Sequence, residues 1–205
     1  MDEIILCTRR IECSPHYFAQ ALKAESVAYV VAPYEADAQM AFLERTGVVD
    51  GILTEDSDLL VFGCKKILLK LDANEATVTS ISRCDFAVMG ATTTGGFSLL
   101  GWTDEQFRAM AILSGCDYLP SIPGIGLKTA WNLLKKHKTA SKVIQAVKLE
   151  GKKVVPKGYN EAFNLAEKVF LHQRVYDPAQ ECLVYLSERP HGVEWNEAEE
   201  EHVGR

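Results

Sequence analysis

Two pairs of acidic residues follow two short apolar runs of the chain. Glu35 and Asp37 come after the first run, and Asp56 and Asp58 come after the second. If the two runs are neighbouring parallel strands, the four carboxylates meet at one edge of the sheet, where open α/β sheets bind ligands. Carboxylate oxygens suit Mg²⁺ and Mn²⁺, and a bound cation relieves the repulsion between them. The spacing therefore favours a site for a divalent metal ion.

Each acidic residue also has an interpretation that needs no metal. Acidic residues in the first turn of a helix interact favourably with the helix dipole, which would account for Glu35 and Asp37. Aspartates in a turn accept hydrogen bonds from the backbone, which would account for Asp56 and Asp58. Asp117, in the segment SGCDYLP, could likewise be a turn residue. The metal interpretation is favoured because both pairs follow adjacent predicted strands.

A glycine-containing turn precedes a lysine-rich segment. Gly124 and Gly126 lie where a helix is predicted to begin, so backbone N–H groups at its N-terminus can face a phosphate. Lys128, Lys135 and Lys136 lie in the same predicted helix and could contact one DNA backbone without reading bases. The alternative is a connector followed by a helix with a solvated basic face.

The charge of the chain is segregated, although its net value is −6. Residues 25–58 contain eight acidic residues and one arginine, whereas residues 124–158 contain nine lysines and one glutamate. The six cysteines form no C-x-x-C pair, so a zinc site is disfavoured and a reducing compartment is favoured. The sequence has no run of 18 apolar residues, so we expect no membrane partner.

The hydrophobic pattern predicts an α/β fold. Residues 27–32, 35–45 and 49–54 read as strand, helix and strand, a βαβ unit with parallel strands. Further strands are predicted at 59–62, 66–71 and 76–81, a loop at 90–101, and helices at 104–114, 128–136, 140–147 and 159–172. Thr103 and Gln106 form a predicted capping box. Residues 181–205 read as an acidic, solvated tail.

Four sequence motifs, taken together, point to one protein superfamily. They occur between roughly residues 25 and 187 in the order VAPYEADAQMAFL, ILTEDSDLLVFGCKKILLKLD, AILSGCDYLPSIPGIGLKTA and FLHQRVYDP. Together they resemble the flap endonuclease superfamily of structure-specific 5′ nucleases, in its exonuclease 1 branch. The resemblance implies a PIN-like parallel-sheet nuclease core, followed by a helix–two-turn–helix element that holds duplex DNA.

The resemblance also implies an activity and a set of ligands. The activity is that of a hydrolase of DNA repair: metal-dependent cleavage of phosphodiester bonds, 5′→3′ from duplex ends and nicks or at 5′ flaps. Two Mg²⁺ or Mn²⁺ ions would serve the reaction, one activating the attacking water and the other stabilising the leaving oxygen. The implied ligands are Glu35, Asp37, Asp56, Asp58 and Asp117 for these ions, and Ser114, Ser121 and Ile125 for a K⁺ at the hairpin. The implied partners are DNA with 5′ ends, nicks or flaps and mismatch-repair proteins, and the implied location is the nucleus.

The chain departs from the family pattern at its start. The family places a further metal-binding strand, catalytic basic residues and a helical arch before the first matched motif, and we expect that residues 1–24 do not contain them. The expected domains are this unmatched segment, a partial nuclease core at 25–117, the helical DNA-binding element at 118–180 and the tail at 181–205. Besides the nuclease, an inactive paralogue or fragment that retains DNA binding stays open. A phosphatase or glycosyl-transfer metal motif is disfavoured by the lysine-rich hairpin.

Overall fold

The computed structural model describes residues 15–88, 97–189, 192 and 194–204. Its chain forms two compact units, each with its own buried core. The first unit combines the chain up to Arg83 with His172–Glu194 and the last two residues. The second unit combines Cys84–Leu171 with Trp195–Val203.

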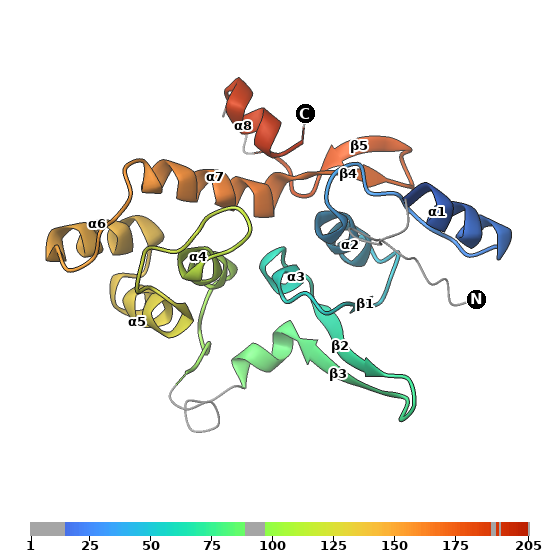
Figure 1. The fold of residues 1–205 in the computed structure, drawn as a ribbon, viewed down its shortest axis with the longest axis horizontal. Coiled ribbons are helices and arrows are strands. Elements are labelled where there is room, and N and C mark those ends of the chain that lie inside the picture. The colour runs from blue at the N-terminus through green and yellow to red at the C-terminus, as the bar shows by residue number, and fades with distance from the viewer. Residues whose placement is uncertain (1–14, 89–96, 190–191, 193, 205) are drawn as a thin grey trace. The chain divides into compact units, whose positions relative to one another are not determined.

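The first unit contains all the strands of the described chain (Figure 1). Its helices are α1 (Pro15–Ala24), α2 (Ala36–Arg45) and α3 (Asp58–Val61). Its strands are β1 (Ile52–Leu53), β2 (Lys66–Asp72), β3 (Thr77–Ser82), β4 (Arg174–Asp177) and β5 (Cys182–Tyr185).

The sheet next to α2 and α3 is mixed rather than all-parallel. β1 pairs with β2 in parallel, with Ile52 opposite Ile67, and β2 pairs with β3 as an antiparallel hairpin. The predicted hairpin of 66–71 and 76–81 is therefore confirmed. A second sheet consists of the antiparallel pair β4 and β5. The α/β class is right, and the sheet is mixed because the turn after Asp72 reverses the chain.

Two predicted strands are not strands in the structure. Residues 27–32 form only an isolated β-bridge at Tyr29. No strand of the described chain runs beside them, and the Val31 side chain is 65% exposed. Residues 59–62 lie in and directly after the short helix α3. This segment turns helical because local hydrogen bonds close it, with the Phe62 N–H donating to the Asp58 carbonyl. The predicted βαβ unit is thus replaced by a strand–helix–strand unit of β1, α3 and β2.

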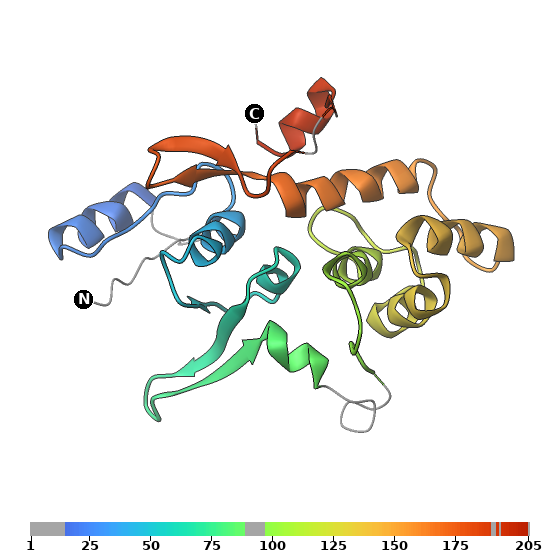
Figure 2. The same cartoon turned by 180° about the vertical axis from the view of Figure 1, so that it is seen from behind.

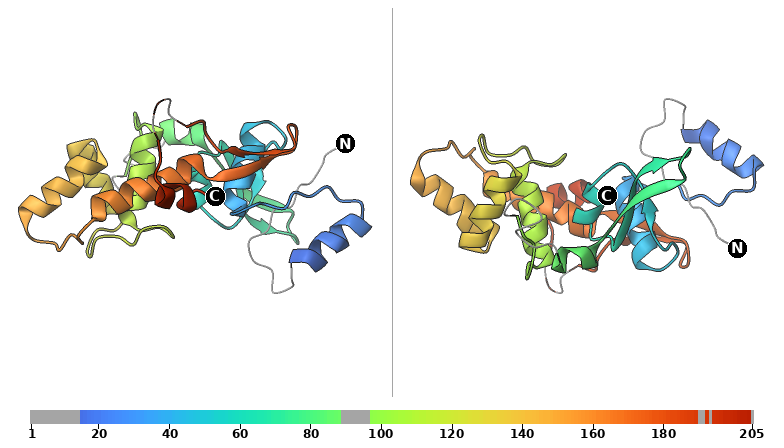
Figure 3. Two further views of the ribbon diagram at one scale, coloured as in Figure 1. Left: turned by 90° about the horizontal axis from the view of Figure 1, so that it is seen from above. Right: turned by 90° about the horizontal axis from the view of Figure 1, so that it is seen from below.

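The second unit is helical. It contains α4 (Asp104–Ser114), α5 (Leu127–His137), α6 (Ala140–Glu150), most of α7 (Tyr159–His172) and α8 (Glu197–His202), and the 3₁₀ helix η1 (Arg83–Ala87) leads into it. The helices α4, α5 and α6 pack against one another (Figures 2 and 3). All four helices predicted between 104 and 172 are confirmed, and so is the capping box at Thr103 and Gln106. The sequence is sufficient to predict these helices because helix caps and apolar stripes depend only on residues a few positions apart.

The predicted tail has more structure than a solvated chain. Residues 182–185 form β5, which pairs with β4, and residues 197–202 form α8. The side chains of Leu186, Trp195 and Val203 are buried, so these apolar residues anchor the segment despite its acidic composition. Of the predicted loop at 90–101, residues 97–101 contain neither helix nor strand, and the remainder lies outside the described residues.

Candidate metal site and nucleic-acid interface

The first acidic pair lies at the N-terminus of α2. Glu35 is the N-cap residue, in an extended conformation, and its carbonyl accepts the Gln39 N–H at 3.3 Å. Asp37 lies in the first turn and is 7% exposed. The partial positive charge of a helix N-terminus favours carboxylates at both positions. A buried carboxylate such as that of Asp37 also needs compensating donors or a cation, because burial removes its hydration.

The second acidic pair forms a turn that leads into α3. The Thr54 Oγ accepts the Asp56 N–H at 2.9 Å, and the Asp56 Oδ1 accepts the Asp58 N–H at 2.8 Å. This is the side-chain-to-backbone bonding that the turn interpretation predicts. It is compatible with metal binding as well, because an ionised carboxylate has two oxygens with about four acceptor sites. Asp56 is exposed and Asp58 is half-buried.

Both acidic pairs belong to the first unit, in which α2 and α3 contact each other. Their oxygens have the chemistry that Mg²⁺ and Mn²⁺ require. Within the part of the chain that the structure describes, however, no group of three or more His, Cys, Asp or Glu side chains is close enough to hold a metal ion. Asp117 lies in the second unit, exposed, on a turn where the backbones of Cys116 and Leu119 bond each other. The five-residue ligand set stays a prediction.

Three polar side chains of α2 bond distant segments of the first unit, and those of Gln39 and Glu44 are buried. The Gln39 Nε2 donates to the Tyr176 carbonyl at 2.8 Å, and the Gln39 Oε1 accepts the Tyr176 N–H at 2.7 Å. The Glu44 Oε1 accepts the backbone N–H groups of Lys65 and Lys66, at 3.0 and 3.1 Å. The third residue, Arg45, is described next. The sequence signal for such residues is weak: Gln39 and Glu44 flank the helix stripe that carries Met40 and Leu43, and Arg45 lies on the opposite face.

Arg45 connects the end of α2 to two other segments. Its guanidinium donates to the carbonyl of Phe62, to the carbonyl of Leu186 at 3.2 Å and to the Ser187 Oγ at 3.0 Å. Phe62 is the residue that ends α3. One side chain therefore joins the helix that begins next to Glu35 to the helix that begins at Asp58.

The glycine turn of the second unit has the conformation that its sequence predicts. Gly124 has φ of +80°, in the region that favours glycine, and Gly126 is the N-cap residue of α5. The Lys153 Nζ donates to the Gly124 carbonyl at 2.8 Å. Lys153 was not among the predicted site residues, although its position in the basic segment is a usable signal.

The three predicted DNA-contacting lysines are all on α5. Lys128 lies in its first turn and Lys135 and Lys136 in its last, and all three are exposed. The Lys135 ammonium lies 5.0 Å from the centre of the Trp131 ring, a cation–π contact. Since exposed lysines at both ends of one helix can reach separate phosphates, this surface suits a nucleic-acid backbone.

The residues predicted to bind K⁺ surround the turn between α4 and α5. Ser114 is the last residue of α4, and its hydroxyl donates to the Ala111 carbonyl at 2.8 Å. Ser121 packs against Gly115, where an added Cβ would lie 3.3 Å from the Ser121 nitrogen. Ile125 is buried, and its N–H donates to the Ile122 carbonyl at 2.8 Å. Hydroxyls and carbonyls are thus available at this turn, and the ion itself stays a prediction.

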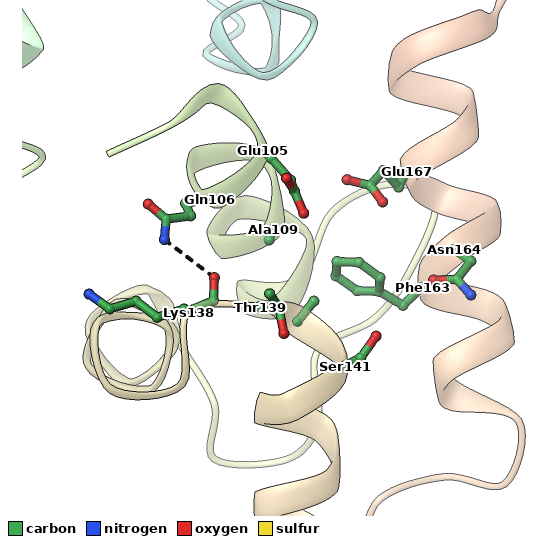
Figure 4. A pocket seen from close by; sticks show the side chains of 10 residues that line it. Glu105, Gln106, Ala109, Lys138, Thr139, Ser141, Phe163, Asn164 and Glu167 are labelled. Atoms are coloured by element: carbon green, nitrogen blue, oxygen red, sulfur yellow. Dashed lines mark hydrogen bonds between the residues drawn. The ribbon is translucent and has the colours of Figure 1, made fainter. Parts of the chain in front are cut away.

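A cavity of about 70 Å³ lies among α4, α6 and α7 of the second unit (Figure 4). The Gln106 Nε2 donates to the Lys138 carbonyl at its rim, at 3.3 Å. Its other walls are Glu105, Ala109, Thr139, Ala140, Ser141, Phe163, Asn164 and Glu167. None of the predicted metal or DNA-binding residues lines this cavity, so it is separate from the candidate sites.

The fold resembles that of solved structures of a junction-resolving enzyme. The structure of the junction-resolving enzyme GEN-1 with potassium matches with a TM-score of 0.66 and 22% identity, over 86% of this chain and 48% of that one. The structure of GEN1 with product DNA and Mg²⁺ matches with a TM-score of 0.63 and 21% identity, over 87% and 48%. At this level of identity the likeness establishes the fold.

The sequence comparisons show which nucleases the chain resembles. Residues 26–117 match the family model of the XPG I-region. The chain is 46% identical to exonuclease 1 of Oryza sativa over 177 residues and 42% identical to exodeoxyribonuclease 1 of Schizosaccharomyces pombe over 167 residues. These matches cover 84% and 82% of the chain but only 20% and 28% of the two relatives. The predicted resemblance to exonuclease 1 within the flap endonuclease superfamily is confirmed.

No helix in the described part of the chain has the length and apolar character needed to cross a membrane.

Proposed function

We propose that the chain is the metal-binding and DNA-holding part of a 5′→3′ DNA exonuclease and 5′ flap endonuclease of DNA repair. One observation carries the proposal: both acidic pairs begin helices of the segment that matches the XPG I-region. The lysine-bearing helix α5 of the second unit supports a DNA partner.

Glu35, Asp37, Asp56 and Asp58 would hold Mg²⁺ or Mn²⁺, with Asp117 as a fifth ligand. A bound divalent ion would supply a water of lowered pKa and stabilise negative charge on a phosphodiester. The residues of the chain provide the hard oxygen donors, and the partial positive charge at the N-terminus of α2 favours carboxylates at that position.

Duplex DNA would bind along α5. The turn at Gly124 and Gly126 with α4 and α5 would act as a helix–two-turn–helix, or helix–hairpin–helix, element. Backbone N–H groups at the start of α5 would contact one phosphate, and Lys128, Lys135 and Lys136 would contact others. Ser114, Ser121 and Ile125 would bind K⁺ at this turn, which the likeness to the structure of GEN-1 with potassium supports. A nuclear location and mismatch-repair partners follow from the role of a DNA repair enzyme and belong to the same proposal.

A nuclease assay tests the proposal directly. The purified chain is incubated with a 5′-recessed or nicked duplex in Mg²⁺, beside a double variant with Asp56→Asn and Asp58→Asn. We expect nucleotide release by the unmodified chain and a loss of at least a hundredfold in the variant. A variant with Glu75→Gln, in the exposed turn between β2 and β3, is the matched control and should retain full activity.

DNA binding is measured separately from cleavage, in EDTA and at several salt concentrations. Replacing Lys128, Lys135 and Lys136 by glutamine should weaken binding and reduce its salt dependence by roughly one counterion per lysine. Salt-sensitive binding without cleavage would favour the inactive DNA-binding chain over the nuclease. Absence of binding at low salt would contradict both functions.

A further inference from the structure

The C-terminal end of α2 carries two charged side chains with specific contacts, of which Glu44 is buried and Arg45 is partly exposed. Glu44 is 6% exposed, and one of its oxygens accepts two N–H groups at the start of β2. Arg45 bonds three acceptors outside its own helix. Burying a charged group is unfavourable unless it is well bonded, and the Glu44 Oε2 is buried without a hydrogen-bond partner, so the two bonds of the Glu44 Oε1 compensate its burial only in part. Arg45 is held by its three acceptors.

The contacts of Arg45 and Glu44 lead to the second acidic pair. Arg45 binds the carbonyl of Phe62, whose own N–H bonds the carbonyl of Asp58 across the single turn of α3. Glu44 fixes the backbone of Lys65 and Lys66, where β2 begins beside β1. The turn that carries Asp56 and Asp58 lies between β1 and α3 and is held from both sides.

We propose that Glu44 and Arg45 are positioning residues for the divalent metal ion of the proposed nuclease site, on which this inference rests. The N-terminus of α2 carries one acidic pair, and the C-terminus of α2 fastens the segment that carries the other. Both residues set the spacing between the two pairs without touching the ion. Residues behind the direct ligands typically change metal affinity by about 10- to 100-fold when they are replaced.

Gln39 provides a matched control on the same helix. Its side chain is fully buried and makes two hydrogen bonds of 2.7–2.8 Å, as strong a connection as that of Glu44. Those bonds go to Tyr176 of β4, a strand without any predicted metal ligand. Loss of Gln39 should therefore lower stability and leave the spacing of the acidic pairs unchanged.

Mn²⁺ affinity is measured by titration calorimetry on the full chain, at a temperature below the unfolding midpoint of every variant. Stability is measured separately by urea unfolding without metal. We expect Arg45→Met and Glu44→Ala to weaken Mn²⁺ binding about tenfold or more. Glu44→Gln keeps the accepting oxygen and should bind Mn²⁺ like the unmodified chain. Arg45→Lys can donate to the Phe62 carbonyl but cannot span all three acceptors, so it should show an intermediate loss. Gln39→Ala should lose stability and retain affinity.

The outcomes separate this inference from the proposed function. If Mn²⁺ binds and depends on Asp56 and Asp58, but Arg45→Met and Gln39→Ala bind equally well at equal stability, the positioning role is wrong and the metal site stands. If the unmodified chain binds no more Mn²⁺ than the Asp56→Asn, Asp58→Asn variant, the proposed metal site fails and the positioning role fails with it. If Arg45→Met does not fold, Glu44→Gln and Arg45→Lys are compared instead. Full Mn²⁺ affinity in Glu44→Gln with reduced affinity in Arg45→Lys supports the positioning role. Equal Mn²⁺ affinity in the two variants overturns it.

Discussion

At the scale of single residues, Cys64 shows how burial controls chemistry in the first unit. Its side chain has no exposed surface, and it lies directly after α3 near Glu44. Burial in a medium that solvates a thiolate poorly, together with the charge of Glu44, raises the pKa of Cys64 to about 12. The folded chain therefore keeps the thiol neutral and unreactive.

This raised pKa predicts a pH dependence of stability. Because the folded chain favours the neutral thiol, the contribution is complete below the ordinary thiol pKa of 9.0 and is lost as pH rises from there towards about 12. Cys64→Ala should lower the free energy of unfolding at pH 7 through a small cavity. Between pH 9 and 11 the free energy of unfolding should fall less steeply with pH in Cys64→Ala than in the unmodified chain. The two slopes should differ by up to about 1.4 kcal/mol per pH unit. Urea denaturation at several pH values measures both slopes, and equal slopes would refute the assignment.

At the scale of elements, the strands β4 and β5 are part of the first unit although about 90 residues of helical chain separate them from β3. β4 bonds the Gln39 side chain, and the segment after β5 supplies the carbonyl of Leu186 and the hydroxyl of Ser187 to Arg45. These contacts explain why an acidic, weakly hydrophobic segment is ordered. The Leu186 carbonyl and the Ser187 hydroxyl of this segment accept hydrogen bonds from the Arg45 guanidinium at the C-terminus of α2.

Two shortened chains test this dependence. A chain that ends after Glu188 retains β4, β5 and the acceptors of Arg45, whereas a chain that ends after Gln180 loses β5, Leu186 and Ser187. We expect the shorter one to lose hydrogen-exchange protection in α2 and β4, since Arg45 loses two acceptors and β4 loses the strand that pairs with it. The longer one lacks α8 as well, so it is the matched control and should keep that protection. Equal protection in the two chains would show that β5 is dispensable.

At the scale of the whole molecule, each unit has its own core, and all three tryptophans lie in the second. Trp102, Trp131 and Trp195 therefore report on one unit only. Leu43 in the first unit and Leu134 in the second are both 1% exposed and provide an equivalent pair of core positions.

The two leucines predict different unfolding signals. Leu43→Ala should destabilise the first unit by about 2–5 kcal/mol and shift the circular dichroism transition, with little change in the midpoint of tryptophan fluorescence. Leu134→Ala should shift the fluorescence midpoint by a similar free energy. Urea titrations followed by both signals measure these effects. A shift of the fluorescence midpoint in Leu43→Ala as large as that in Leu134→Ala would mean that the chain unfolds as one cooperative body.

The sequence by itself determined the helices of the second unit, the hairpin of β2 and β3 and the resemblance to exonuclease 1. Helix caps, apolar stripes and turn residues act over a few positions, so a pattern such as Thr103 with Gln106 is legible without a structure. The placement of Glu35 at the N-terminus of α2 also depends only on local chain, whereas the run after Asp58 has a strand-like pattern and forms the helix α3 instead. Their role as ligands stays a prediction.

Only the tertiary structure decided which apolar runs become strands and which polar residues are buried. Residues 27–32 and 59–62 have strand-like composition, but a strand needs a neighbour to bond, and no local pattern reveals whether one is present. The bonds of Gln39 and Arg45 connect residues 137 to 142 positions apart. Contacts of that range depend on how the chain folds back on itself, which is why they appear in the structure and not in the sequence.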